Sequence, residues 1–170
     1  DFLGKKNYEK FGNDFPLLIK FIDARQDLSI QVHPDDELSA KRHGKMGKNE
    51  MWYVVDADRG SQLIAGFTQK IETNEYAQKV ADGSIENDLN KVNVSEGDCF
   101  YIPAGRVHGI GAGMVIAEIQ QTSDVTYRIY DYLRRDRDGN LRELHTELAL
   151  NAIAIEDITT DPKVVSEDPP

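Results

Sequence analysis

Apolar and polar residues alternate with a period of two in several short segments of the chain. In segment 28–33, Leu28, Ile30 and Val32 alternate with polar residues, which is typical of a strand with one wet or functional side. Other short apolar segments bounded by turn residues predict further strands. These segments are 15–24, 50–55, 62–67, 93–94, 98–102, 114–121 and 125–132. We expect 15–24 to be a buried strand.

Helical signals are fewer and short. Residues 34–37 open a short helix, because proline suits a first turn and acidic residues complement its positive end. Segment 73–81 is predicted to be a helix capped by Thr73 and stopped by Gly83, and 144–155 has a helical apolar pattern. Many short strands with few helices predict a mainly β fold, a sandwich or barrel carrying short helical insertions.

Composition and charge narrow the possible functions. The 170 residues fit one compact domain. The net charge of −10 argues against nucleic-acid and membrane partners, so an anionic substrate would need a local basic cluster. The lone Cys99 excludes an internal disulfide and a multi-cysteine zinc site. Because no apolar run approaches about 20 residues and the first residues do not resemble a signal peptide, we expect a cytoplasmic protein.

The most specific motif lies at 97–108. A glycine begins a strand, Pro103 and Gly105 make a tight turn, and His108 follows. This arrangement resembles the second cupin motif, G-x5-P-x-G-x2-H, although Ala112 stands where that motif has an asparagine. A hairpin with an incidental histidine is the alternative, and agreement at four fixed positions disfavours it.

Three other residues complete a possible metal site with His108. Gln31 and His33 are two apart on a predicted strand, so both can point toward one ion. Glu50 begins a strand that enters the core beside Trp52, where a carboxylate is costly unless it is paired or metal-bound. Alone, the histidine is more often a hydrogen-bonded structural residue, and the glutamate is as often solvated. Together they offer two imidazole nitrogens and two oxygens, a set that suits zinc.

Long stretches of the chain closely resemble bacterial type I mannose-6-phosphate isomerases. The matching stretches are 15–24, 28–36, 47–53, 103–108 and 118–131. Two departures from an ordinary cupin are part of the likeness: a glutamine at position 31 and sixteen residues, 34–49, before Glu50. The resemblance implies a cupin-type jelly roll and a zinc-dependent isomerase that interconverts mannose 6-phosphate and fructose 6-phosphate through an enediol(ate).

The resemblance also implies a domain organisation. We expect residues 1–155 to form a single cupin-like metal-binding domain, followed by an acidic, extended tail at 156–170. The family's N-terminal segment and second cupin half have no counterpart in this sequence. We therefore expect a fragment, and activity of the fragment alone stays open.

Residue roles follow from the same resemblance. One zinc ion per chain would be bound by Gln31, His33, Glu50 and His108. The catalytic arginine falls on Arg128, ten residues after Glu118. Arg128, always charged, suits enediolate stabilisation, and Lys48 or Glu118 would be the base. Arg106, Arg134 and Lys48 are nominated for the substrate phosphate.

Two other functions remain open. An iron-dependent cupin oxygenase is disfavoured because a two-histidine, one-carboxylate site leaves no role for Gln31. A non-catalytic sugar-binding cupin is disfavoured by the complete ligand set and Arg128, but the absence of family segments keeps it possible. An isomerase assay compared with sugar-phosphate binding would separate these readings.

Overall fold

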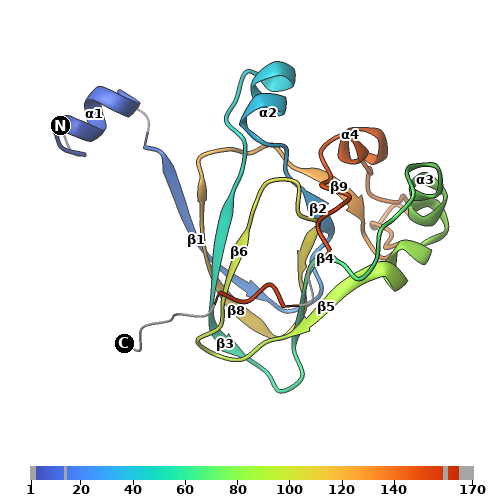
Figure 1. Ribbon diagram of the computed structural model, residues 1–170. Coiled ribbons are helices and arrows are strands. Elements are labelled where there is room, and N and C mark those ends of the chain that lie inside the picture. The colour runs from blue at the N-terminus through green and yellow to red at the C-terminus, as the bar shows by residue number, and fades with distance from the viewer. Residues whose placement is uncertain (1–2, 14, 159–160, 165–170) are drawn as a thin grey trace.

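The structure is a computed structural model that describes residues 3–13, 15–158 and 161–164 (Figure 1). The strands are β1 (Leu17–Ala24), β2 (Ile30–Val32), β3 (Glu50–Ala57), β4 (Gln62–Phe67), β5 (Leu89–Asn93), β6 (Cys99–Ile102), β7 (His108–Ile110), β8 (Met114–Gln121) and β9 (Tyr127–Tyr130). The helices are α1 (Lys5–Phe11), α2 (Asp36–His43), α3 (Thr73–Asp82), the 3₁₀ helix η1 (Ser84–Asp88) and α4 (Thr146–Leu150).

The strands form two sheets that pack face to face. One sheet has the order β1-β8-β3-β6 and the other β5-β4-β7-β2-β9, and every strand pair is antiparallel. Figure 1 shows the two sheets facing one another, with α3 and α4 beyond the five-stranded sheet. The mainly β sandwich with short helices is therefore confirmed.

The layer between the sheets changes from apolar to polar along β8. Met114, Ile116, Glu118 and Gln120 are the buried positions of this strand. At the apolar end, Ile116 belongs to a buried cluster contributed by both sheets. The charged and amide side chains thus gather at one end of the layer, where β3 begins opposite the end of β8.

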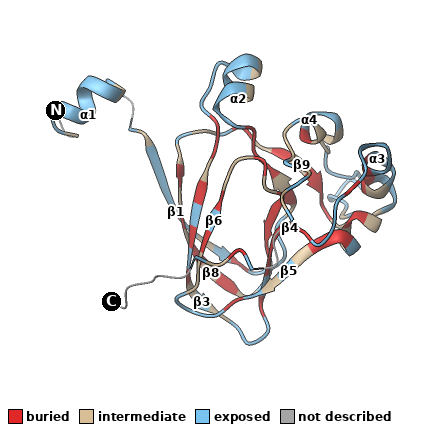
Figure 2. Ribbon diagram, viewed as in Figure 1, coloured by how far each residue is buried: buried red, intermediate tan, exposed pale blue. Residues whose placement is uncertain are grey.

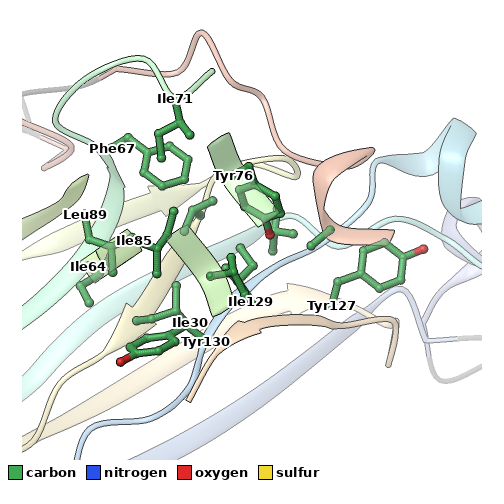
Figure 3. Packing of buried hydrophobic residues seen from close by; sticks show 14 of the residues in the cluster. Ile30, Ile64, Phe67, Ile71, Tyr76, Ile85, Leu89, Tyr127, Ile129 and Tyr130 are labelled. Atoms are coloured by element: carbon green, nitrogen blue, oxygen red, sulfur yellow. The ribbon is translucent and has the colours of Figure 1, made fainter. Parts of the chain in front are cut away.

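A second apolar cluster covers the other face of the five-stranded sheet. Ile30 and Val32 of β2 pack there with Tyr76 of α3 and Ile85 of η1 (Figure 3). Residues of β2 that alternate with these two point into the layer between the sheets. Burial on both faces fixes the position of β2, and with it the position of Gln31.

The prediction of a buried strand at 15–24 is wrong. Among the described strands, β1 pairs with β8 alone and forms one edge of its sheet, and Figure 2 shows it largely exposed. Phe21 is 74% exposed and Ile19 58% exposed. Cross-strand register places them in the same rows as Tyr53 and Met51 of β3, which are also exposed. We call these four side chains the outer apolar face.

Several element boundaries also differ from expectation. The cap of α2 is Asp35, whose side chain accepts a hydrogen bond from the Leu38 amide at 2.8 Å. Thr73 is the first residue of α3 rather than its cap, while Gly83 ends the helix in the left-handed conformation as expected. The predicted helix at 144–155 is reduced to the five residues of α4.

Part of the segment expected to be a tail packs on the domain. Asp157 forms an ion pair with Arg106, and Lys163 bridges to Phe100 at the β6 edge of the sheet. Residues 159–160 and 165–170 of that segment lie outside the described residues. Among the residues described, no helix is both long and apolar enough to cross a membrane.

The two faces of β8 provide a test of this architecture. Ile116 is fully buried between the sheets, whereas Ile119 lies on the opposite, partly exposed face. We expect Ile116→Ala to lower the free energy of unfolding by about 2–5 kcal/mol, because it removes buried methyl groups and leaves a cavity. Ile119→Ala is the matched control and should cost distinctly less, measured by urea unfolding. Equal losses would contradict the assignment of faces.

Candidate metal centre

Side chains from both sheets meet at the polar end of the layer. Gln31 lies on β2 directly opposite His108 of β7, and Glu50 is the first residue of β3. His33 follows β2. The ligand atoms of His33, Glu50 and His108 all lie within 4.8 Å of one another, and the three side chains are buried. The structure brings together the residues that the sequence nominated as metal ligands.

The two histidines are held in one tautomer by the backbone. His33 Nδ1 lies 3.0 Å from the Val125 carbonyl oxygen, and His108 Nδ1 lies 2.9 Å from the Arg106 carbonyl oxygen. A carbonyl oxygen only accepts hydrogen bonds, so each Nδ1 carries the proton and donates it. In the neutral rings, both Nε2 lone pairs point into the site, where His33 Nε2 has no hydrogen-bond partner among the described residues and His108 Nε2 faces the Gln31 side-chain amide.

The Glu50 carboxylate faces one of these lone pairs. Its Oε1 lies 3.2 Å from His33 Nε2 and 2.9 Å from Lys48 Nζ. The lysine contact is an ion pair without hydrogen-bond geometry, and both His33 Nε2 and Glu50 Oε1 are buried with no hydrogen-bond partner among the described residues. Two unpartnered acceptors at this distance repel each other unless a cation or proton lies between them. This pair of atoms fits a metal ion.

Protonation also suits metal binding. Burial, followed by the neighbouring His33, lowers the pKa of His108 to about 3, so its ring is neutral at ordinary pH. Burial acts to raise the pKa of Glu50, but the interactions with His33, His108 and Lys48 outweigh it and hold this pKa well below its usual value. Neutral imidazole and ionised carboxylate are the forms that coordinate metals.

Gln31 can supply the fourth donor. Its side-chain nitrogen lies 3.2 Å from His108 Nε2. A half-turn of the amide exchanges its oxygen and nitrogen, so Oε1 can take this position. Ligands about 2.1 Å from one tetrahedral ion lie about 3.4 Å apart. The observed spacing is close to that, and the four side chains fit a divalent cation.

The long segment between His33 and Glu50 closes on itself. The Lys48 amide donates to the Pro34 carbonyl at 3.2 Å, and the Gly47 amide donates to Asp36 Oδ1 at 2.8 Å. A Cβ atom on Gly47 would lie 2.5 Å from the backbone of Asp35, so only glycine allows this close approach. The segment therefore returns the chain to place Glu50 beside His33.

Asn49 is a positioning residue that the sequence analysis did not identify. Its Oδ1 accepts a hydrogen bond from the Ala104 amide at 2.9 Å, and its Nδ2 donates to Gln121 Oε1 at 2.7 Å. These bonds link the start of β3 to the turn before His108 and to the end of β8. The sequence position of Asn49 next to Glu50 is a weak signal of this role, because the residues that it hydrogen-bonds lie far away in the sequence.

Glu118 lies inside the sandwich, on the same face of β8 as Ile116, and is paired. Lys20 of β1 is its cross-strand neighbour, with Nζ 2.5 Å from Glu118 Oε1. The other cross-strand neighbour of Glu118 is Trp52. Lys20 was also missed by the sequence analysis, because it lies in a segment expected to be a buried strand.

Arg128 and Gln31 line a pocket of about 470 Å³ beside the metal centre. The rest of the lining is Gln26, Leu28, Ser29, Asp131, Arg134, Arg135, Asp136 and Arg142. Arg128 donates from Nη1 to the Glu143 carbonyl at 2.8 Å, but its Nε is buried without a partner among the described residues. Burial and the nearby Arg142 lower the pKa of its guanidinium. Lys48 and Glu118 are not part of this lining.

This pocket is locally basic in an acidic chain. Four arginines and two aspartates line it, which is the basic cluster that an anionic substrate requires. Two of the arginines share Asp131 as a partner: Arg134 forms an ion pair with it, and Arg142 Nη1 lies 3.6 Å from its Oδ1. Arg106, nominated for the phosphate, lies elsewhere and is paired with Asp157 at 2.7 Å.

The chain is similar to known sugar-phosphate isomerases. A sequence-family model described as the phosphomannose isomerase type I catalytic domain matches residues 2–79. The mannose-6-phosphate isomerase of Streptococcus mutans is 43% identical over 159 residues, covering 91% of this chain and 50% of that protein. Mannose-6-phosphate isomerase ManA of Bacillus subtilis is 43% identical over 148 residues, covering 86% and 47%.

Solved structures agree with the sequence relatives. The crystal structure of the mannose 6-phosphate isomerase from Bacillus subtilis superposes with a TM-score of 0.78 at 38% identity, covering 85% of this chain and 46% of that one. The cupin-type fold expected from the sequence is thereby confirmed. The chain spans about half the length of the relatives that it matches.

The lowered pKa of His108 predicts a pH-dependent stability of the metal-free protein. The unfolded chain takes up a proton at His108 near pH 6.5, but the folded chain does so only near pH 3. Below pH 6.5 the unfolded state binds more protons, so stability is lost as pH falls through this window. The lowered pKa of Glu50 acts in the same direction below about pH 4.5.

Urea unfolding in the presence of a chelator measures this effect. We expect the free energy of unfolding to fall between pH 6.5 and 4.5, and His108→Gln to flatten that fall. His43→Gln, outside the metal centre, is the control and should keep the slope. An unchanged slope in His108→Gln would contradict a buried neutral imidazole.

Proposed function

The chain belongs to the type I phosphomannose isomerase family, and we propose that this protein interconverts mannose 6-phosphate and fructose 6-phosphate with one zinc ion at the candidate metal centre. The observation that carries the proposal is the buried pair of acceptors His33 Nε2 and Glu50 Oε1, which have no hydrogen-bond partner among the described residues. Gln31 connects this metal centre to the pocket that Arg128 lines. An acidic chain with a basic pocket at a metal centre fits a small anionic substrate.

Zinc is the metal that the donor set favours. Two imidazole nitrogens, a carboxylate oxygen and an amide oxygen suit a d¹⁰ ion that accepts mixed ligands. A zinc ion bound there would supply positive charge that polarises a substrate oxygen. Gln31 borders both the metal centre and the pocket, and would therefore lie between the ion and the rest of the sugar phosphate.

The isomerisation moves a proton between C1 and C2 of the open-chain sugar. Negative charge develops on the substrate oxygens as the enediolate forms. The Arg128 guanidinium, with its Nε unpartnered and buried at the pocket, would stabilise that charge. Lys48, which is paired with Glu50, or Glu118, which is paired with Lys20, would carry the proton.

The phosphate would bind among the pocket arginines. Arg134 and Arg142 meet at Asp131, whose Oδ2 is buried and has no hydrogen-bond partner in the described part of the chain, and Arg134 also donates to the Asp27 carbonyl at 2.6 Å. These contacts hold the two guanidinium groups at the pocket wall, and planar guanidinium donors match phosphate oxygens. We propose Arg142 rather than Arg106 for this role, because Arg106 is paired with Asp157 and does not line the pocket. We place this reaction in the cytoplasm.

Proton exchange at the sugar tests the reaction. Zinc-loaded protein is incubated with mannose 6-phosphate in deuterated water and followed by NMR. We expect fructose 6-phosphate to form, with deuterium entering at C1 or C2 through exchange of the transferred proton. Binding of the sugar phosphate without conversion would instead support a non-catalytic sugar-binding cupin, and would overturn the proposed activity.

Removing one ligand tests the metal assignment. We expect His108→Ala to abolish zinc binding while the fold is retained, because the ion loses one of its two imidazole donors. Zinc per chain is measured by mass spectrometry after gel filtration, and the fold by circular dichroism. His43→Ala, which changes a histidine outside the centre, should keep one ion per chain. Full zinc occupancy in His108→Ala would contradict the assignment.

Removing the pocket arginine tests the proposed charge stabilisation. We expect Arg128→Ala to keep its zinc and to lose turnover by about 10²–10³-fold, the usual effect of deleting one stabilising donor. Arg59→Ala is the matched control, since Arg59 lines a separate pocket with Met114 at the other end of β8. An unchanged rate in Arg128→Ala would remove this residue from its role.

A further inference from the structure

The two oxygens of Glu50 have different surroundings. Oε1 faces His33 Nε2 at 3.2 Å and Lys48 Nζ at 2.9 Å, so it points into the metal centre. Oε2 accepts a hydrogen bond from the indole nitrogen of Trp52 at 3.0 Å and lies 3.8 Å from His108 Nε2. Oε1 therefore accepts no hydrogen bond among the described residues, whereas Oε2 already accepts one.

Trp52 is fixed in position. It is two residues after Glu50 on β3, so both side chains project into the layer between the sheets. The indole is fully buried among apolar side chains of both sheets, and its ring centroid lies 5.4 Å from that of the His108 ring, with an interplanar angle of 80°. An indole N–H can only donate, and breaking its buried hydrogen bond would leave it without a partner.

We propose that Trp52 is a positioning residue that restricts Glu50 to coordinate the metal through Oε1 alone. This inference rests on the proposed metal function. A carboxylate can bind a cation through one oxygen or both, and rotation of the Glu50 group toward bidentate binding would break the hydrogen bond to the indole. The restriction leaves a coordination position for a substrate oxygen, as catalytic zinc sites require.

Two variants separate this role from packing. Trp52→Phe keeps a buried aromatic ring but removes the N–H donor. Phe100→Leu is the control, because Phe100 is the cross-strand neighbour of Trp52, is fully buried in the same cluster and offers no hydrogen bond. We expect Trp52→Phe to weaken zinc binding by about 10- to 100-fold, the usual effect of losing a group that orients a ligand. Phe100→Leu should change it much less.

Competition with a chromogenic chelator measures zinc affinity, and X-ray absorption at the zinc edge measures how many carboxylate oxygens are bound. We expect one carboxylate oxygen in the wild type and two in Trp52→Phe. The same affinity and the same coordination in Trp52→Phe as in Phe100→Leu would overturn the inference.

The wild-type protein gives a test that needs no variant to fold. Trp52 is the sole tryptophan in the sequence, so one indole N–H signal in the nitrogen–proton NMR spectrum belongs to it. We expect that signal to shift on zinc addition and to stay protected from solvent exchange. Loss of protection on zinc binding, or bidentate coordination in the wild type, would overturn this inference alone. Failure of the wild type to bind zinc would overturn the proposed function and this inference with it.

Discussion

The structure depends on holding the acceptor atoms of His33, Glu50 and His108 close together in a buried place. The lone pairs of His33 Nε2 and Glu50 Oε1 face each other at 3.2 Å, and His108 Nε2 joins them. Such an arrangement is unfavourable by itself, so the surrounding structure must enforce it. Backbone carbonyls fix both rings, an indole fixes one carboxylate oxygen, and the folded segment before β3 brings the glutamate back. The proposed cation would convert this repulsion into attraction between the two sheets.

The convergence of Gln31, His33 and His108 was predictable from sequence because each carries a local constraint. Alternation along β2 and the residue after it places Gln31 and His33 on one side, and the proline-glycine turn directs His108 inward. These predictions rest on backbone geometry, which a few neighbouring residues determine. The burial of β1 was misjudged, because apolar character does not distinguish a central strand from an edge strand whose outer side is exposed.

The supporting residues were not predictable in this way. Asn49, Lys20 and Trp52 act through partners on other strands, and only the strand order and register bring those partners close. The basic pocket is a similar case, since Arg142 comes from a loop that follows β9 and reaches the same wall as Arg128. Sequence patterns describe each segment alone, whereas these contacts belong to the assembled sandwich.

The outer apolar face has a consequence for the behaviour of the protein in solution. The sheet that carries Glu50 on its inner side exposes aromatic and aliphatic side chains on its other side, with an open strand edge at β1. At neutral pH, a net charge of −10 keeps copies of the chain apart by long-range repulsion. That repulsion vanishes near the isoelectric point of about 4.8, where hydrophobic attraction between such faces goes unopposed. Colloidal stability of this polypeptide is thus set by its acidic surface rather than by the chemistry of its interior.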